Sequence, residues 1–320
     1  MADDFVSIDV GGTTVRVARG RADGTVEQVV EFPTDSHGGP DDVLGRIAAQ
    51  VDAVCGGGRP ERVGIGLPGT VDPRTGVSHF LPNMPGNWRG VAVGETLRRR
   101  LGCEVRTLND VRQHTMGELA FGHGRGRDRL TMIYVGIGTG IGGGIVIEGK
   151  LRLGPLGAAG EVGHMTILPS GPRCGCGNRG CLETLASGPA LASAAIRLLD
   201  TGQAPELYRL VEGNADRVNG KTITEAAEAG DTSIREVIAT SAEYLGLAMA
   251  NLVTALHPDM IVIGGGVSLI GEMLFGPLRK TVRDRVRMFG TDDIEIVPSR
   301  LGDDAGILGG LASAAFGTEA

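Results

Sequence analysis

The feature that most constrains the fold is a strand–turn–strand pattern that occurs twice. Residues 5–30 contain an aliphatic strand, FVSIDV, the turn GGTT and a returning strand, VRVARGR. Residues 131–151, TMIYVGIGTGIGGGIVIEGKL, repeat the pattern with a second turn that carries glycine and threonine. Extended apolar runs separated by a glycine turn favour paired strands, so each copy predicts a β-hairpin. The duplication predicts two related α/β domains.

Alternating strands and helices follow each hairpin. The apolar spacing predicts strands at 62–69 and 104–110, a strand that ends in a glycine loop before a helix at 260–268, and helices at 92–101, 234–256 and 304–316. We expect an N-terminal α/β domain at residues 1–108 and a C-terminal α/β domain at residues 109–303, with a helix at 304–320 crossing back to the first domain. Because no low-complexity linker separates them, the two domains are expected in close contact around a cleft.

Composition and charge exclude several classes of protein. The 54 glycines of this 320-residue chain cluster in short runs beside apolar strands, which predicts backbone that approaches a ligand closely. A net charge of -7 and the lack of a basic stripe argue against a nucleic-acid partner. We see no signal peptide and no apolar run long enough to span a membrane. We therefore expect a cytoplasmic protein.

Three glycine sites share the chemistry of nucleotide-phosphate binding. Glycine turns let backbone N–H groups converge on an anion, and threonine hydroxyls add donors. A carboxylate beside such a turn would repel phosphate, so we interpret Asp9 as a residue that holds hydrated Mg2+. An ordinary hairpin is the alternative for any single turn, and three such sites disfavour it. The candidate ATP and Mg2+ residues are Asp9, Gly11, Gly12, Thr13, Thr14, Gly138, Thr139, Gly264, Gly265 and Gly266.

A polar pair, Asn109 and Asp110, follows a predicted strand. An aspartate at such a place can accept the proton of a hydroxyl that attacks phosphorus, while the asparagine orients the alcohol. Both residues are also common helix N-caps, and the cap would be the preferred interpretation if the pair stood alone. The phosphate-type turns elsewhere in the chain favour Asp110 as a catalytic base.

Three cysteines and one histidine have the spacing of a metal site. Cys174, Cys176 and Cys181 fall within eight residues, and His164 in EVGH precedes them by ten. Disulfides are unlikely to persist in a cytoplasmic chain, and the spacing differs from a redox C-x-x-C pair. Three thiolates and an imidazole form a closed tetrahedral set typical of structural zinc. A histidine that only packs in the core is the alternative. Zinc would direct Glu161 and Glu183 towards one pocket.

Together these motifs resemble the ROK family of sugar kinases and sugar-responsive repressors, in the actin/hexokinase-like superfamily. The matching segments are DVGGTTVR at 9–16, GLPG at 66–69, LND at 108–110, GIGTGIGGG at 136–144, GEVGH at 160–164, CGCGNRGCLE at 174–183, IVIGGG at 261–266 and LGDDAGILGG at 301–310. The resemblance implies a two-domain actin/hexokinase-like (ribonuclease H-like) α/β fold with an inter-domain cleft. It implies Asp110 as the catalytic base and His164 as a zinc ligand. The candidate sugar contacts are Asn83, Asn109, Asp110, Glu161, His164 and Glu183.

The chain departs from the family pattern in two places. Thr14 stands where lysine is common, and VRQHTMGE replaces small residues after Asp110, which brings Arg112, Gln113 and His114 near the base. The sequence leaves open whether these side chains face the sugar or the solvent. It also leaves open which sugar is bound.

The resemblance covers more than one class of protein. An ATP-dependent hexose kinase is preferred over a sugar-sensing repressor, because repressors carry a helix-turn-helix module before the first strand and here that strand starts by Phe5. A sugar-binding protein without turnover is disfavoured by Asp9 and Asp110. We expect phosphorylation of the 6-hydroxyl of glucose, with an amino or N-acyl hexose (kanosamine, N-acetylglucosamine or N-acetylmannosamine) as the alternative. Mg2+, structural Zn2+ and a homodimer or homotetramer are expected.

Overall fold

The computed structural model describes residues 4–81 and 84–318. The strands are β1 Phe5–Val10, β2 Thr14–Gly20, β3 Val26–Pro33, β4 Arg62–Leu67, β5 Thr70–Asp72, β6 Val77–Phe80, β7 Glu104–Asn109, β8 Met132–Ile137, β9 Ile141–Ile147, β10 Lys150–Arg152, β11 Met260–Gly264 and β12 Glu295–Pro298. The α-helices are α1 Pro40–Val54, α2 Val93–Leu101, α3 Asp110–Ala120, α4 Glu183–Ala186, α5 Gly188–Asp200, α6 Pro205–Val211, α7 Gly220–Glu228, α8 Thr232–Leu256, α9 Glu272–Arg285 and α10 Ala305–Phe316.

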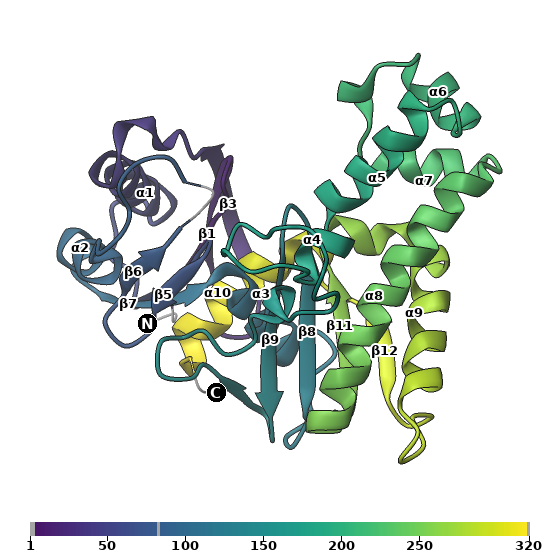
Figure 1. The fold of residues 1–320 in the computed structure, drawn as a ribbon. Coiled ribbons are helices and arrows are strands. Elements are labelled where there is room, and N and C mark those ends of the chain that lie inside the picture. Colours follow the sequence, from purple (N-terminus) through teal and green to yellow (C-terminus); the bar gives the residue numbers. More distant parts are fainter. Residues whose placement is uncertain (1–3, 82–83, 319–320) are drawn as a thin grey trace. The chain divides into compact units, whose positions relative to one another are not determined.

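Two five-stranded sheets have the same strand order (Figure 1). The first runs β3-β2-β1-β4-β7 and the second β10-β9-β8-β11-β12. In the first sheet β1 is antiparallel to β2 and parallel to β4, which is itself parallel to β7. In the second, β10 is antiparallel to β9 and β11 is parallel to β12. Each predicted hairpin therefore supplies the first strands, in chain order, of a mixed sheet. The expected α/β class is confirmed.

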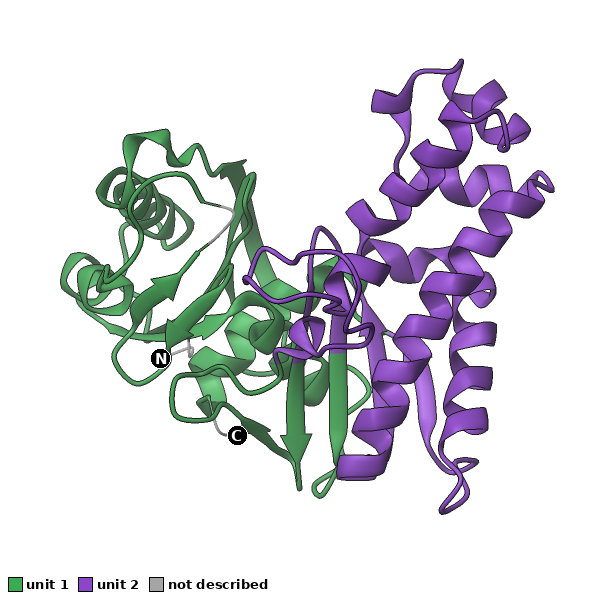
Figure 2. Cartoon of the chain, viewed as in Figure 1, with its two compact units in different colours: residues 1–134, 144–160, 299–320 green, residues 135–143, 161–298 purple. Residues whose placement is uncertain are grey.

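The chain forms two compact units, coloured separately in Figure 2. Unit 1 contains residues 1–134, 144–160 and 299–320, and unit 2 contains residues 135–143 and 161–298. The chain therefore passes between the units after residues 134, 143, 160 and 298. These limits do not coincide with the expected division after residue 108, because α3 packs on α10 within unit 1. A domain boundary at 108 stays a prediction.

In unit 1 the first sheet is covered by helices. Helices α1 and α2 contact β2, β3 and β7, while α10 contacts β1 and β4 and α3 contacts β4. The small residues of α10 allow this close packing, since a Cβ at Gly310 would overlap Ser7 and one at Gly309 would overlap the backbone of Gln113. The strand side chains between the layers, such as Ile8 and Ile65, are fully buried. Unit 1 thus fixes the ends of β1 and β7, where Asp9 and Asn109 lie.

In unit 2 the long helix α8 packs against α9, α5 and α7. Its N-terminus is capped by Asp231, whose side chain accepts a hydrogen bond from Ile234 N at 3.2 Å. Among the described residues α8 is the one helix that is long and apolar enough, by length and composition alone, to cross a membrane. Since 56% of that stretch is buried inside the structure, α8 has the character of a core helix.

Candidate active site

Asp9 occupies the C-terminal part of β1 in unit 1 and is half-buried. The first turn of α10 lies directly against its carboxylate, because a Cβ at Gly306 would overlap Asp9 Oδ2. His114 Nε2 lies 4.0 Å from Asp9 Oδ1. This arrangement suits an acidic group that holds a hydrated cation.

The first glycine turn is closed by its own backbone. Gly11 N donates to Thr14 O at 2.8 Å, and Gly11 O accepts from Thr34 Oγ1 at 2.7 Å. Gly12 and Thr13 are exposed at the tip of the turn, and Thr14 begins β2. A phosphate bound here would therefore contact Gly12 and Thr13, whereas the Gly11 N–H is already engaged.

The structure separates the two interpretations of the Asn109–Asp110 pair. Asn109 is the N-cap of α3: its Oδ1 accepts from Val111 N at 3.0 Å and from Arg112 N at 3.2 Å. Its Nδ2 donates to Gly69 O at 2.8 Å, which joins the LND and GLPG segments. Asp110 is the first residue of the helix and is half-buried. Asp110 Oδ1 also accepts a hydrogen bond from Val111 N at 2.8 Å, while Asn109 is the N-cap residue of the helix.

The environment of Asp110 makes it a stronger base than an ordinary aspartate. Burial raises the pKa of Asp110 to about 6, and the nearby charge of Asp9 adds to the rise. His114 and the N–H of Val111 act in the opposite direction. A carboxyl group with a pKa near 6 is ionised at neutral pH and accepts a proton more readily than a carboxylate in water.

The side chains of Arg112, Gln113 and His114, which follow Asp110, pack within unit 1. Arg112 is 1% exposed and donates to Asn109 Oδ1 at 2.9 Å and, through Nη2, to Ala159 O at 2.8 Å. Gln113 is fully buried, and its Nε2 donates to Ile8 O at 3.0 Å. His114 packs edge-on against Tyr134, with ring centroids 6.2 Å apart. Arg112 and Gln113 therefore do not face solvent.

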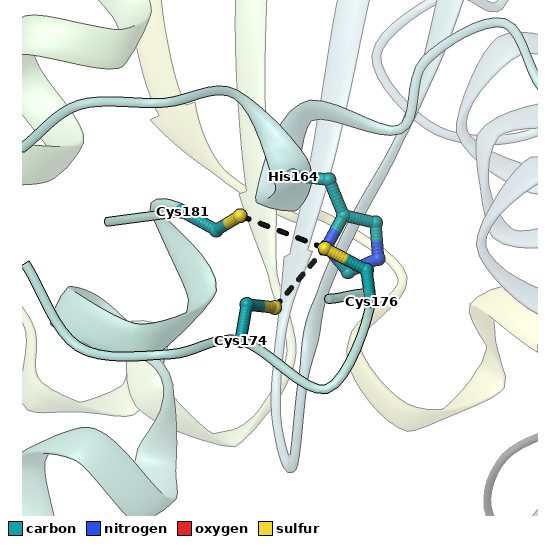
Figure 3. Close-up of side chains that lie close together, drawn as sticks. All are labelled: His164, Cys174, Cys176 and Cys181. Carbon is teal, nitrogen blue, oxygen red and sulfur yellow. Dashed lines mark hydrogen bonds between the residues drawn. The ribbon is translucent and has the colours of Figure 1, made fainter. Parts of the chain in front are cut away.

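The four predicted metal ligands converge in unit 2 (Figure 3). The ligand atoms of His164, Cys174, Cys176 and Cys181 all lie within 4.8 Å of one another. Cys176 Sγ is 3.7 Å from Cys181 Sγ, and Cys174 Sγ is 3.6 Å from His164 Nδ1. A zinc tetrahedron with sulfur ligands has edges of about 3.8 Å. Zn2+ fits this set of donors.

A cation bound at this cluster would have to displace the protons of the thiols. Burial raises the pKa of Cys174 and of Cys181, while the backbone N–H of Asn178 lowers the pKa of Cys176. Two buried thiols that resist ionisation are poor ligands until a cation deprotonates them. Since Nδ1 of His164 faces the sulfur atoms, Nε2 is left on the side of Glu161, with its Oε2 at 3.9 Å. The histidine can therefore serve the metal and a polar ligand at the same time.

Glu183 joins the cysteine cluster to the second glycine turn within unit 2. Its Oε1 accepts from Cys174 Sγ at 3.8 Å, and its Oε2 accepts from Ile141 N at 3.0 Å. The EVGH turn also contacts Ile141, because a Cβ at Gly163 would overlap Ile141 O. The turn that carries Gly138 and Thr139 is therefore held from both sides of the metal cluster.

The second and third glycine sites lie close together in unit 2. Gly265 approaches the end of β8 so closely that a Cβ there would meet Ile137 O. Gly188 N, at the start of α5, donates to Gly138 O at 2.9 Å. Gly138 and Gly266 are exposed, and a Cβ at either position would have no neighbour within 4 Å. These two α-carbons present bare backbone that a nucleotide can approach.

The structure places the candidate residues in two groups. Unit 1 holds Asp9, Gly11, Gly12, Thr13, Thr14, Asn109 and Asp110; unit 2 holds Gly138, Thr139, Glu161, His164, Cys174, Cys176, Cys181, Glu183, Gly264, Gly265 and Gly266. Asn83 lies outside the described residues. Sequence reasoning missed Glu118, which is fully buried and accepts hydrogen bonds from Arg300 N and Leu301 N. The available signal was a lone acid within the small and apolar stretch TMGELA.

Comparison with known proteins agrees with this architecture. The profile of the ROK family matches residues 5–315. A glucokinase of Thermotoga maritima is 38% identical over 309 residues, which cover 95% of each chain. The crystal structure of a ROK family glucokinase from Streptomyces griseus in complex with glucose and AMPPNP has a TM-score of 0.83 and 33% identity, covering 97% of this chain and 99% of that one. The chain belongs to the ROK family, and the expected actin/hexokinase-like fold is confirmed.

A regulator shares the same fold. The crystal structure of a ROK family transcriptional regulator, a homologue of the Escherichia coli MLC protein, has a TM-score of 0.85 and 28% identity. This similarity covers 97% of the present chain but 76% of the regulator. The fold alone therefore does not separate kinases from regulators, and the side chains of the site must do so.

Proposed function

We propose that this protein is an ATP-dependent hexose kinase that transfers the γ-phosphoryl group to the 6-hydroxyl of glucose. The observation that carries the proposal is Asp110, a carboxylate beside the N-cap residue Asn109 that is made more basic by burial. Similarity to the glucokinases of Thermotoga maritima and Streptomyces griseus supports glucose as the sugar and ATP as the donor. In this proposal the protein acts in carbohydrate metabolism, as in glycolysis, lies in the cytoplasm and forms a homodimer or homotetramer.

The residues of unit 1 would perform the chemical step. Asp110 accepts the proton of the 6-hydroxyl as its oxygen attacks phosphorus, and the Asn109 side chain orients the alcohol. Asp9 would hold Mg2+, which when bound would supply positive charge to offset the negative charge of the phosphates. The closed thiol and imidazole set leaves a bound Zn2+ no open position, so Zn2+ would order Glu161 and Glu183 without taking part in the reaction.

The sugar preference can be tested with a coupled ADP-release assay over glucose, mannose, fructose, allose, N-acetylated hexosamines and free amino sugars. We expect kcat/KM for glucose to exceed that of each other sugar, by about 10-fold or more where a hydroxyl that the site binds is missing or replaced. Glu161, His164 and Glu183 offer partners for several neutral hydroxyls. Carboxylates would also bind an ammonium group. If the kcat/KM for a 2- or 3-amino sugar were well above that for glucose, the substrate would be an amino sugar and not glucose.

The pH profile tests the state of Asp110. The carboxylate is the form that accepts a proton, and burial raises the pKa of Asp110 to about 6. We therefore expect kcat/KM to be constant at and above neutral pH and to fall about tenfold per pH unit once the pH is below 6. Initial rates at saturating Mg-ATP, with coupling enzymes checked at each pH, measure this. A profile that stays flat down to about pH 5 would contradict an essential base of this pKa.

A sugar-sensing regulator is the second candidate, favoured by the fold match to the MLC homologue. A regulator of this kind would bind a sugar without releasing ADP. Calorimetric titration of the same sugar panel separates the two functions. Sugar binding without ADP release for every sugar would favour the regulator, whereas turnover of any hexose establishes the kinase.

A further inference from the structure

Helix α3 begins with Asp110. Side chains of this helix contact residues beside the four passages, the points where the chain leaves one unit and enters the other. The passages follow residues 134, 143, 160 and 298 (Figure 2). On the unit 1 side, Tyr134, Gly144 and Ser299 lie directly at three of these points, and Ala159 lies one residue before the fourth, Gly160. Each of them is contacted by a side chain of α3, and all of these contacts lie within unit 1.

Arg112 makes the attachment beside the passage after residue 160. Its Nε and Nη2 donate to Ala159 O at 3.1 and 2.8 Å, while Nη1 donates to Asn109 Oδ1 at 2.9 Å. The guanidinium is planar and rigid, so bonds from its two edges fix the distance between the acceptors. Arg112 therefore joins the cap of the helix that carries Asp110 to a carbonyl two residues before Glu161.

Glu118 makes the attachment beside the passage after residue 298. Its Oε1 accepts from Ser299 Oγ, from Arg300 N at 2.8 Å and from Leu301 N at 3.1 Å. Its Oε2 accepts from His123 N at 3.1 Å. A fully buried carboxylate with this many donors is costly to move, because any bond that is lost leaves a buried group unpaired.

The two remaining passages contact α3 by packing. His114 lies edge-on to Tyr134, the last residue of unit 1 before the first passage. Thr115 is fully buried beside Gly144, the first residue of unit 1 after the second passage, so closely that a Cβ at Gly144 would overlap Thr115 Oγ1. Helix α3 therefore contacts the chain beside all four passages, through hydrogen bonds at two of them and through packing at the other two.

We propose that Arg112 is a positioning residue that ties the connection at Gly160–Glu161 to the helix of the catalytic base, so that movement of the units on sugar binding sets the position of Asp110. The inference rests on the proposed kinase function. Lysine could not replace Arg112 fully, because an ammonium on a flexible stem lacks the fixed fork that reaches both Asn109 and Ala159.

The test compares Arg112→Ala and Arg112→Lys with a matched control, Arg106→Ala. Arg106 also binds backbone carbonyls inside unit 1, with Nη1 2.8 Å from Ser313 O and 3.2 Å from Ala314 O, but these acceptors lie in α10, away from the passages. We expect Arg112→Ala to lower kcat/KM for glucose about 100-fold, since small misplacements of reacting groups have effects of that size. Arg112→Lys should recover only part of this loss, and Arg106→Ala should keep wild-type kinetics.

Two further readouts separate positioning from mere stability. Guanidinium at millimolar concentration should restore part of the kcat of Arg112→Ala and leave Arg106→Ala unchanged. Small-angle scattering should show a sugar-induced decrease in the radius of gyration for wild type and Arg106→Ala, and a smaller decrease for Arg112→Ala. Wild-type kcat/KM in Arg112→Ala, or equal kinetic losses in Arg112→Ala and Arg106→Ala at equal Tm, would overturn the inference.

The same experiment distinguishes failure of the inference from failure of the proposed function. Absence of turnover by the wild-type protein with every hexose would refute the kinase, and the scattering comparison with a bound sugar would still test the coupling. If Arg112→Ala does not fold, Arg112→Lys carries the test, because it keeps a charge and a long stem. Wild-type kcat and unchanged compaction in Arg112→Lys would then count against the inference.

Discussion

Replacement of Asp110 by asparagine is expected to lower kcat by about 100- to 10,000-fold while the Kd for glucose changes little. Asparagine has nearly the same shape but cannot accept the proton of the attacking hydroxyl, so the loss falls on the chemical step. Asn109 caps α3 independently, so the helix should keep its start. Single-turnover and steady-state ADP release measure the rate, and calorimetric titration with glucose measures the affinity.

A matched control for this variant is Asp231→Asn. Asp231 is 3% exposed and caps α8 in unit 2, so its replacement should reduce Tm and leave kcat unchanged. Asp9→Ala offers a second contrast, since it should raise the KM for Mg-ATP through loss of the cation-holding carboxylate. Near-wild-type turnover of Asp110→Asn would leave Asp110 without a role as the base.

Loss of the metal is expected to have the second large effect. We expect about one zinc per chain, and we expect Cys176→Ser to lose the metal together with most sugar affinity, because the metal orders the turn that carries Glu161. Affinity for the nucleotide should fall as well, since Glu183 and Gly163 hold the turn of Gly138 next to the cluster. Metal analysis of protein purified without added zinc, with titrations of glucose and AMPPNP, measures the three quantities.

Cys103→Ser is the matched control for the metal prediction. Cys103 is half-buried in unit 1, outside the cluster of possible metal ligands, so its replacement should leave zinc content and both affinities unchanged. A metal-free wild-type protein with full activity would refute a structural zinc. Retained nucleotide affinity in a metal-free Cys176→Ser would restrict the effect of the metal to the sugar side.

Local sequence patterns predicted several of the strands and helices, and they predicted the cluster of His164 with three cysteines. The helix expected at 234–256 is α8, Thr232–Leu256, because a long apolar stripe and a following proline define it without reference to the rest of the chain. The three cysteines and His164 converge as predicted, since ten residues of spacing limit how far apart they can lie. Strand β5, Thr70–Asp72, escaped notice because three residues are too few to show alternation.

Tertiary contacts decide what the sequence left open. Nothing local indicates whether Arg112 points to solvent or inwards; its direction follows from the carbonyl of Ala159, which lies 47 residues away in the chain. The same holds for Glu118 Oε1, whose partners lie more than 180 residues further on. The limits of the compact units also depend on such long-range contacts, because the packing of α10 on α3 brings residues near the C-terminal end into unit 1.

The position of α10 has a consequence for biosynthesis. This helix covers β1 and β4, yet it is translated after every other element of unit 1, whereas all of unit 2 precedes residue 299. A nascent chain can therefore complete unit 2 while the first sheet, made at the start of translation, still exposes an apolar face. Unit 1 can close its core only when Gly309 and Gly310 have left the ribosome and reached Gln113 and Ser7, so a chain stalled before that point would be vulnerable to aggregation and proteolysis.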